Sequence, residues 1–357
     1  MKESLLTLME NLPEKMDGAM ITSDLNRRYF TDMKSSAGIL LLTRKSACFI
    51  IDFRYIEKAK SVITDFNVVL QSDDVYGQIN DFFREEGAKR IGLETDCVTI
   101  SDYSRYCEKL PELTLSNDDS LSSLISELRS CKAPEEVELI KAAQAITDQT
   151  FTHILNFIRP GVTEREIAVE MEYTMRKLGA SGLAFDSIVA SGVNSSMPHA
   201  VPSDKKVETG DFVTLDFGAA YNGYCSDMTR TIAVGAISEE QRRVYDTVLT
   251  AQKMAIEAIP ECKYYSDVDK VARDYIYSQG YEGCFGHGLG HSLGLFIHEN
   301  PRFSMSCREL IQPNVIETVE PGVYLEGKFG VRIEDMVLIT EEGAVDLTNS
   351  KKELITL

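Results

Sequence analysis

Five side chains in the second half of the chain combine carboxylates with one imidazole, and each stands in an apolar or glycine-rich stretch. They are Asp216 in VTLDFG, Asp227 in GYCSDMTRT, His291 in GHGLGHSLG, Glu320 in TVEPGVY and Glu334 in GVRIED. Burying four carboxylates and an imidazole together is costly unless a cation neutralises them. The set therefore indicates a hydrolase site that binds two metal ions.

The first two carboxylates belong to a predicted hairpin. In FVTLDFG, apolar and polar residues alternate, which places Asp216 on the strand face opposite the main apolar side chains. Asn222-Gly223 is a strong signal for a tight turn. The returning strand then brings Asp227 opposite Asp216 or one diagonal step away. Two bare carboxylates so placed would repel each other unless a metal ion lies between them.

The other two carboxylates, Glu320 and Glu334, are symmetric in the sequence about Gly327. A three-residue turn centred on that glycine would pair them directly across a second hairpin. We expect His291 on a separate strand, where the glycines of GHGLGH permit close approach of backbone or ligand. A single acid of this kind is more often a surface or turn residue, but both pairs fall on predicted hairpins.

The chemistry of the donors limits the choice of metal. Oxygen donors with one imidazole and no thiolate favour manganese or cobalt, with zinc and iron(II) as alternatives. Two such ions about 3.5–4 Å apart would share a hydroxide, lower its pKa and polarise a substrate carbonyl.

Length and composition describe an ordinary globular protein with room for two domains. The chain has 357 residues, of which 43% are hydrophobic and 26% are charged. A formal net charge of −19 argues against a nucleic-acid partner, and no apolar stretch is long enough for a membrane span. Eight cysteines without close pairing favour a reducing compartment, so we expect a cytoplasmic protein.

Residues 1–125 are predicted to form an α/β domain of alternating short strands and helices. GILLLT and ACFIID flank a polar turn at residues 44–46 and predict a hairpin. FNVVL and RIGLE predict further strands, separated by the amphipathic segment DVYGQINDFFREEG. The polar stretch at residues 116–123 marks the expected domain boundary. We see no catalytic cluster in this half.

Residues 126–357 are predicted to contain two rounds of helix, helix and strands. Thr163 and Glu166 form a capping box for a helix of the first round, as do Ser238 and Gln241 in the second. The repetition implies an internal pseudo-repeat whose sheets join in one curved surface. The expected fold class of the whole chain is therefore α+β, with two domains.

Several motifs, in this order, resemble those of the metal-dependent Xaa-Pro peptidases. They are MPHAV, DFGAAYNGYCSDMTRT, GHGLGHSLGLFIHENP, TVEPGVY and GVRIEDMVLIT, and the match covers roughly residues 128–350. That family includes aminopeptidase P and prolidase, relatives of methionine aminopeptidase with the pita-bread fold. The first half resembles, more weakly, the creatinase/prolidase N-terminal domain. The resemblance thus implies a pita-bread catalytic domain over residues 126–357.

The resemblance also implies a ligand set for two divalent ions: Asp216, Asp227, His291, Glu320 and Glu334. Asp227 and Glu334 would bridge the ions, and Glu320 would accept the proton of the attacking hydroxide. The implied reaction is hydrolysis of the peptide bond between an N-terminal residue and proline by a metal-bridging hydroxide. By family analogy, the enzyme would be a homodimer acting on small peptides with proline at the second position.

Four other residues in the matched motifs are candidates for the substrate pocket. By similarity, His199 and His298 would stabilise the tetrahedral intermediate or donate to the substrate carbonyl, and His287 would lie beside the proline ring. Arg332 stands two residues before Glu334 on the same strand face, so we expect it to orient a metal-binding carboxylate through a bidentate contact.

Two residues near these motifs are expected to be structural. His153 lies outside the matched motifs, and strand parity places Glu317 on the face opposite Glu320. The spacing of GHGLGH does not fit a dinucleotide fingerprint, so NAD is not expected.

Other function classes are less consistent with the sequence. A catalytically silent pita-bread binding protein, or a metal-free creatinase-type C–N hydrolase, would typically have lost metal ligands, whereas this chain keeps all five. Methionine aminopeptidase does not normally carry this kind of N-terminal half. The sequence leaves open whether the substrates are Xaa-Pro dipeptides, whose free carboxylate needs a nearby cation, or peptides of three or more residues.

Overall fold

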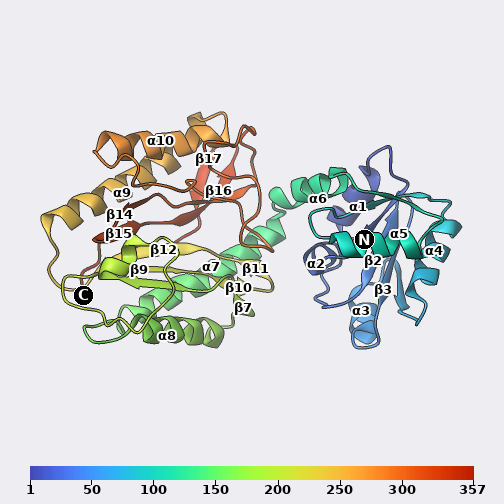
Figure 1. The fold of residues 1–357 in the computed structure, drawn as a ribbon, viewed down its shortest axis with the longest axis horizontal. Coiled ribbons are helices and arrows are strands. Elements are labelled where there is room, and N and C mark those ends of the chain that lie inside the picture. The colour runs from blue at the N-terminus through green and yellow to red at the C-terminus, as the bar shows by residue number, and fades with distance from the viewer. The chain divides into compact units, whose positions relative to one another are not determined.

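A computed structural model describes all 357 residues, which divide into two compact units, Met1–Arg129 and Ser130–Leu357 (Figure 1). The mixed α/β content and the two-domain organisation confirm the predicted fold class. None of the helices combines the length and apolar character that a membrane span requires.

The first unit is built on one six-stranded sheet in the order β4-β3-β2-β1-β5-β6. Its strands are β1 Gly18–Ile21, β2 Ile39–Thr43, β3 Ala47–Ile51, β4 Asn67–Leu70, β5 Arg90–Leu93 and β6 Thr114–Ser116. Its helices are α1 Glu3–Glu10, α2 Asp24–Thr31, α3 Ile56–Val62, α4 Val75–Glu85, α5 Ile100–Lys109 and α6 Ser120–Ser130. The predicted hairpin is the antiparallel pair β2–β3, in which Leu42 faces Ala47.

The first round of the second unit begins with two helices. Its elements are α7 Pro134–Ile154, α8 Glu164–Lys177, β7 Gly182–Leu183, β8 Ile188–Ser191, the 3-10 helix η1 Gly192–Ser196, β9 Phe212–Phe217, β10 Ala219–Tyr221, β11 Tyr224–Cys225 and β12 Met228–Ala233. The capping box before α8 forms as predicted, because the Glu166 carboxylate accepts from Thr163 N at 2.8 Å and the Thr163 hydroxyl accepts from Glu166 N.

The second round repeats the order of helices and then strands. Its elements are α9 Glu239–Ala258, the 3-10 helix η2 Ile259–Glu261, α10 Tyr265–Ser278, β13 Ile316–Val319, β14 Gly322–Leu325, β15 Phe329–Arg332, β16 Asp335–Thr340 and β17 Gly343–Asp346. The capping box of Ser238 and Gln241 is also present. In Figure 1, α9 and α10 lie side by side next to β14 and β15.

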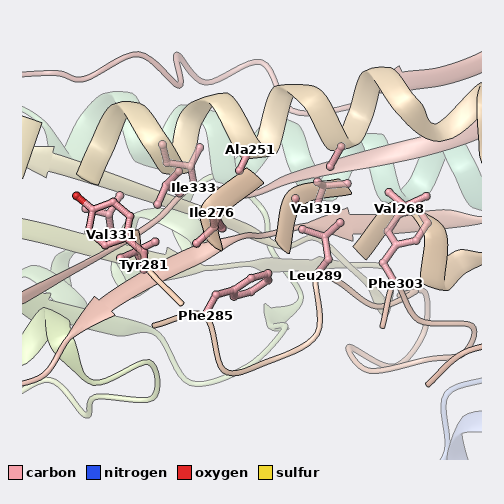
Figure 2. Close-up of a cluster of buried hydrophobic side chains, with 14 of the residues drawn as sticks. Ala251, Val268, Ile276, Tyr281, Phe285, Leu289, Phe303, Val319, Val331 and Ile333 are labelled. Carbon is pink, nitrogen blue, oxygen red and sulfur yellow. The ribbon is translucent and has the colours of Figure 1, made fainter. Parts of the chain in front are cut away.

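A large hydrophobic cluster fixes the position of the second round's strands and loops (Figure 2). Ala251 and Ile276 come from α9 and α10, and Val319 comes from β13. Phe285 and Leu289 anchor the glycine-rich segment that also carries two of the motif histidines. Burying a side chain of the size of valine, leucine or phenylalanine stabilises the fold by roughly 1.5–3 kcal/mol, so this segment is held firmly despite its glycines.

Backbone hydrogen bonds connect the strands of the two rounds into one continuous surface. β8, β9 and β12 form one three-stranded sheet. Glu334 N then donates to Thr229 O of β12 at 3.1 Å. β16 pairs with β13, and Thr318 N donates to the carbonyl of His291 at 2.9 Å. The next segment across is residues 301–303, whose carbonyls accept from the His291 segment. The predicted joining of the two rounds is therefore achieved through edge contacts between separate small sheets.

Candidate metal centre

Asp216 lies on β9, and Asp227 directly precedes β12, the antiparallel partner of β9. Asp216 faces Thr229 in the ladder, and Asp227 precedes Thr229 by two residues, so the two acids are one diagonal step apart. The ladder breaks at Gly218, where a Cβ atom would lie only 1.8 Å from the Ser226 carbonyl oxygen. Only glycine fits there, and the chain beyond it pairs in a different sheet as β10 and β11.

Glu320 and Glu334 face each other between two short ladders that share one register. Gly322 faces Arg332 on one side of the pair, and Val319 faces Asp335 on the other. The turn is centred on Gly327, whose φ of +71° favours glycine. The local turn thus sets the register of the acids, as the sequence predicts.

His291 does not lie in a regular strand, contrary to the expectation from the sequence. It belongs to an extended segment that makes single bridges, Ser292 with Glu299 and with Glu317. The reason is the close approach of β13, because a Cβ atom at Gly290 would lie 1.9 Å from the Thr318 carbonyl oxygen. The segment is held by this contact rather than by a continuous ladder.

The donor atoms of these residues converge in a way that fits divalent metal ions. The Nε2 atom of His291 lies 3.5 Å from Asp227 Oδ2 and 3.6 Å from Glu320 Oε1. Ligand atoms of Asp227, His291 and Glu334 all lie within 4.8 Å of one another. Asp216 Oδ1 is buried and has no hydrogen-bond partner. An orphaned oxygen beside a converging set of carboxylates is satisfied by a cation.

The protonation states support the same interpretation. Burial lowers the pKa of His291 to about 4, so the imidazole is neutral at physiological pH, as a metal ligand must be. Its Nδ1 lies 3.1 Å from the Ser292 carbonyl, which only a protonated nitrogen can donate to. The Nε2 lone pair is therefore directed at carboxylate oxygens of Asp227 and Glu320, an arrangement that a cation between them would stabilise.

The carboxylates themselves are shifted strongly. Burial and the nearby Asp216 raise the pKa of Asp227 well above its ordinary range, and burial and Asp227 do the same to Glu334. Burial also raises the pKa of Glu320 to about 8, although Arg332 acts in the opposite direction. Divalent metal ions would supply the missing positive charge.

Arg332 connects the metal-facing acids to the pocket histidine through a directed hydrogen-bond chain. Its guanidinium donates to Asp216 Oδ2 at 2.6 Å, to the Tyr324 hydroxyl at 2.8 Å and to the Thr229 hydroxyl at 3.1 Å. The Thr229 hydroxyl in turn donates to Glu334 at 2.6 Å. The expected bidentate contact is not formed, because the other nitrogens of the guanidinium are used by these neighbours.

His287 is the far end of this chain. Its Nδ1 lies 2.8 Å from the Gly288 carbonyl, which fixes the proton on that nitrogen, and its Nε2 then accepts from the Tyr324 hydroxyl at 2.9 Å. Burial lowers the pKa of His287 to about 4. Tyr324 and Thr229 were not among the residues predicted for the site, although strand parity indicates both, since each lies on the same strand face as a motif acid.

All nine candidate residues line one cavity of about 660 Å³ in the second unit. They are His199, Asp216, Asp227, His287, His291, His298, Glu320, Arg332 and Glu334. The ring of His298 packs edge-on against His291 at 4.6 Å, and the side chains of His199 and His298 are exposed. The cavity wall also contains residues that no motif indicates, among them Asp186, Ser187 and Arg302.

The residues expected to be structural lie away from this cavity. His153 Nε2 lies 2.6 Å from Glu170 between α7 and α8. Glu317 is fully buried on the opposite face of β13, and burial raises its pKa well above the ordinary range while Lys132 acts to lower it. Neither lines the metal-facing cavity.

Comparison with known proteins agrees with this geometry. The model of metallopeptidase family M24 matches residues 138–341, and that of the creatinase/prolidase N-terminal domain matches residues 3–131. The chain belongs to metallopeptidase family M24, and it is a peptidase.

Individual relatives resemble the chain over almost its whole length. A Xaa-Pro dipeptidase of Pyrococcus furiosus is 36% identical over 99% of this chain and 100% of its own. The solved structure of a Xaa-Pro dipeptidase from Bacillus anthracis is 41% identical, covers 99% of both chains and has a TM-score of 0.94. The structure of an X-Pro aminopeptidase from Thermotoga maritima is 37% identical, covers 96% of this chain and 98% of its own, and has a TM-score of 0.90.

Proposed function

We propose that this protein is a Xaa-Pro dipeptidase that hydrolyses the bond between an N-terminal residue and a C-terminal proline. The observation that carries the proposal is the convergence of one neutral imidazole and four carboxylates in a single cavity of a family M24 chain. Both a dipeptidase and an aminopeptidase stand among the relatives, so the choice between them needs an argument from the cavity itself.

The proposed cofactor is a pair of divalent ions, manganese or cobalt, held by the five donors. When bound, such ions lower the pKa of a water molecule and polarise the scissile carbonyl. Asp227 and Glu334 are the proposed shared ligands, and Glu320 is the proposed proton acceptor.

The histidines are assigned to the substrate. His199 and His298 expose their rings to the cavity and are proposed to donate hydrogen bonds to the carbonyl oxygen of the reacting bond. His287 is proposed to lie beside the proline ring, with its orientation fixed by Tyr324 and the Gly288 carbonyl. Arg332 is proposed to orient Asp216 through the 2.6 Å contact.

Arg302 favours dipeptides over longer peptides. Two arginines line the cavity, and Arg332 already donates to Asp216 and Tyr324. Arg302 is exposed and makes no hydrogen bond or ion pair within the chain. A free guanidinium in a substrate cavity matches a carboxylate in charge and in donor geometry. The C-terminal carboxylate of a dipeptide places that charge directly on the proline.

The test compares Leu-Pro, the neutral Leu-Pro-amide and the tripeptide Leu-Pro-Gly with manganese or cobalt. We expect Leu-Pro to be cleaved with the highest kcat/KM, and Arg302→Met to raise KM for Leu-Pro roughly tenfold or more, about the loss of one charge-assisted hydrogen bond. KM for the amide should change little. Arg308→Met is the matched control, since Arg308 does not line the cavity. Equal cleavage of dipeptide and tripeptide, with no response to Arg302→Met, would favour an aminopeptidase.

The proposal extends to the location, the oligomeric state and the native metal of the protein. A cytoplasmic location agrees with eight cysteines that are all free thiols. Assembly as a homodimer is proposed by family analogy and can be checked by light scattering. The identity of the native metal can be checked by elemental analysis of the purified protein.

A further inference from the structure

The segment between β7 and β8 bulges into the cavity beside Asp216. Leu183 faces Ala219 in one ladder and Ile188 faces Asp216 in the next, so residues 184–187 stand opposite residues 217–218 only. Two extra residues on one strand form a bulge, and bulges near active sites change the direction of side chains. Three consecutive bulge residues, Phe185, Asp186 and Ser187, line the cavity together with Ile188.

This bulge and Arg302 lie at opposite edges of the connected strand surface. The order across that surface is β8, β9, β12, β16, β13, the His291 segment and residues 301–303. The metal-facing acids come from the strands in the middle of this order. A dipeptide whose carboxylate binds Arg302 and whose scissile carbonyl lies over the central acids must therefore direct its N-terminal residue towards the bulge.

The bulge offers apolar walls and one free charge. Phe185 and Ile188 are half-buried, and Asp186 is exposed with a carboxylate that makes no hydrogen bond or ion pair within the chain. The hydroxyl of Ser187, a residue only 4% exposed, has no hydrogen-bond partner. The unpaired Asp186 carboxylate is therefore available to a positively charged group of a bound substrate.

We propose that Asp186 is a specificity residue that favours dipeptides with lysine or arginine at the N-terminus. Such side chains lay their methylene stems along apolar surface and keep the cationic end in water. This matches a cavity wall that combines the half-buried Phe185 and Ile188 with an exposed Asp186. The proposal rests on the proposed dipeptidase function, because Arg302 sets the direction of the substrate.

The expected effect is modest because the charge pair is exposed. Surface ion pairs of this kind correspond to a preference of about two- to fivefold, and salt weakens them. The measurement is the ratio of kcat/KM for Lys-Pro to that for norleucine-Pro, which has the same stem without the charge. We expect a ratio of about two to five at low ionic strength, a ratio near one in Asp186→Asn, and a lower ratio in high salt.

The control is Asp274→Asn, which removes another exposed carboxylate; Asp274 pairs with Lys270 on α10 and does not line the cavity. Its ratio should equal that of the unmodified protein. A ratio of one in the unmodified protein, or an unchanged ratio in Asp186→Asn, overturns the proposal. An equal loss on both substrates also overturns it, because Asp186 would then contact the α-ammonium group. Failure to cleave either dipeptide would instead count against the proposed function.

Discussion

Glu334 and Asp335 are neighbours in sequence, yet their environments are opposite. Both are buried, but Asp335 accepts from Arg230 at 2.6 Å and from Gln252 at 2.7 Å, and Lys352 forms a third contact. Burial acts to raise the pKa of Asp335, but Arg230 and Lys352 outweigh it and lower the pKa. Burial and Asp227 instead raise the pKa of Glu334 well above its ordinary range. The fold therefore gives Asp335 cationic partners, whereas Glu334 has none within the chain and is available to bind a ligand.

The same contrast recurs around the second unit. Asp269 receives two hydrogen bonds from the Arg273 guanidinium, at 2.8 and 3.0 Å, and a third from Leu289 N. Arg273 also donates to the carbonyl of His287, so this pair holds the segment of a pocket histidine from behind. Asp335 and Asp269, which have cationic partners within the chain, therefore hold the site from behind, whereas Asp227 and Glu334 have no such partner and face the cavity.

The matched variants Glu334→Gln and Asp335→Asn test this contrast most directly. Removing a metal-facing acid should lower kcat/KM by at least about 100-fold, since loss of an outer partner alone typically costs 10–100-fold, and should leave the metal-free fold as stable as before. Asp335→Asn should instead destabilise the metal-free protein by roughly 3–5 kcal/mol, because it leaves the buried Arg230 guanidinium without a negatively charged partner.

Urea unfolding of the metal-free proteins and steady-state kinetics with manganese measure the two effects separately. The contrast is wrong if Glu334→Gln unfolds as easily as Asp335→Asn, or if it retains full activity.

The pH dependence of the metal-free protein should show the same difference. When folding raises the pKa of an acid, the acid contributes fully to stability at a pH below its pKa in the unfolded state. This contribution is lost as the pH rises through its pKa in the folded state. For Glu320 that window runs from the ordinary value of 4.5 to about 8. We expect the Tm in a chelator to fall by about 5 °C or more between pH 5.5 and pH 8, and manganese to restore it most at pH 8.

Thermal scans with and without metal make this measurement, and Glu320→Gln is the control. Its metal-free Tm should fall less steeply over the same range. An equally steep fall in the variant would assign the pH dependence to groups outside the metal centre.

The parts of the site that are set by short-range turns could be predicted from the sequence. Gly327 fixes the register that makes Glu320 face Glu334, and the turn after β10 brings Asp227 near Asp216. These positions follow from hairpin geometry, which needs only local sequence. The helix caps at Thr163 and Ser238 are local for the same reason.

The parts that depend on distant packing could not be predicted. Arg302 and Asp186 belong to no recognised motif, since Arg302 follows a loop and Asp186 lies in a bulge. Their positions in the cavity are set by the joined strand surface. The sequence predicts a separate strand at His291, but the close approach of β13 holds this residue in an extended segment with single bridges. In the first unit, the central strand β1 is only four residues long, and the sequence pattern does not predict it.

A smaller effect than the loss of Glu334 is expected at Glu164, a carboxylate with built-in partners. It lies fully buried at the start of α8 and accepts from Ser191, Asn194 and Ser203, which flank the segment that carries His199. In Glu164→Gln, one acceptor oxygen is replaced by an NH₂ group that faces other donors, so the segment should shift. We expect kcat to fall roughly tenfold with KM nearly unchanged, because a small displacement of a positioned group is sufficient to slow turnover.

A role through His199 can be separated from a general loss of stability. Glu166→Gln is the matched control, since Glu166 caps the same helix but does not touch the His199 segment. If Glu164 acts by positioning His199, its substitution should have little further effect on kcat in a His199→Ala background, because the two residues belong to one coupled unit. Two independent, multiplicative losses would instead assign Glu164 to the stability of the fold. Glu164 would then stabilise the fold, as Asp335 is predicted to do, and would not position His199.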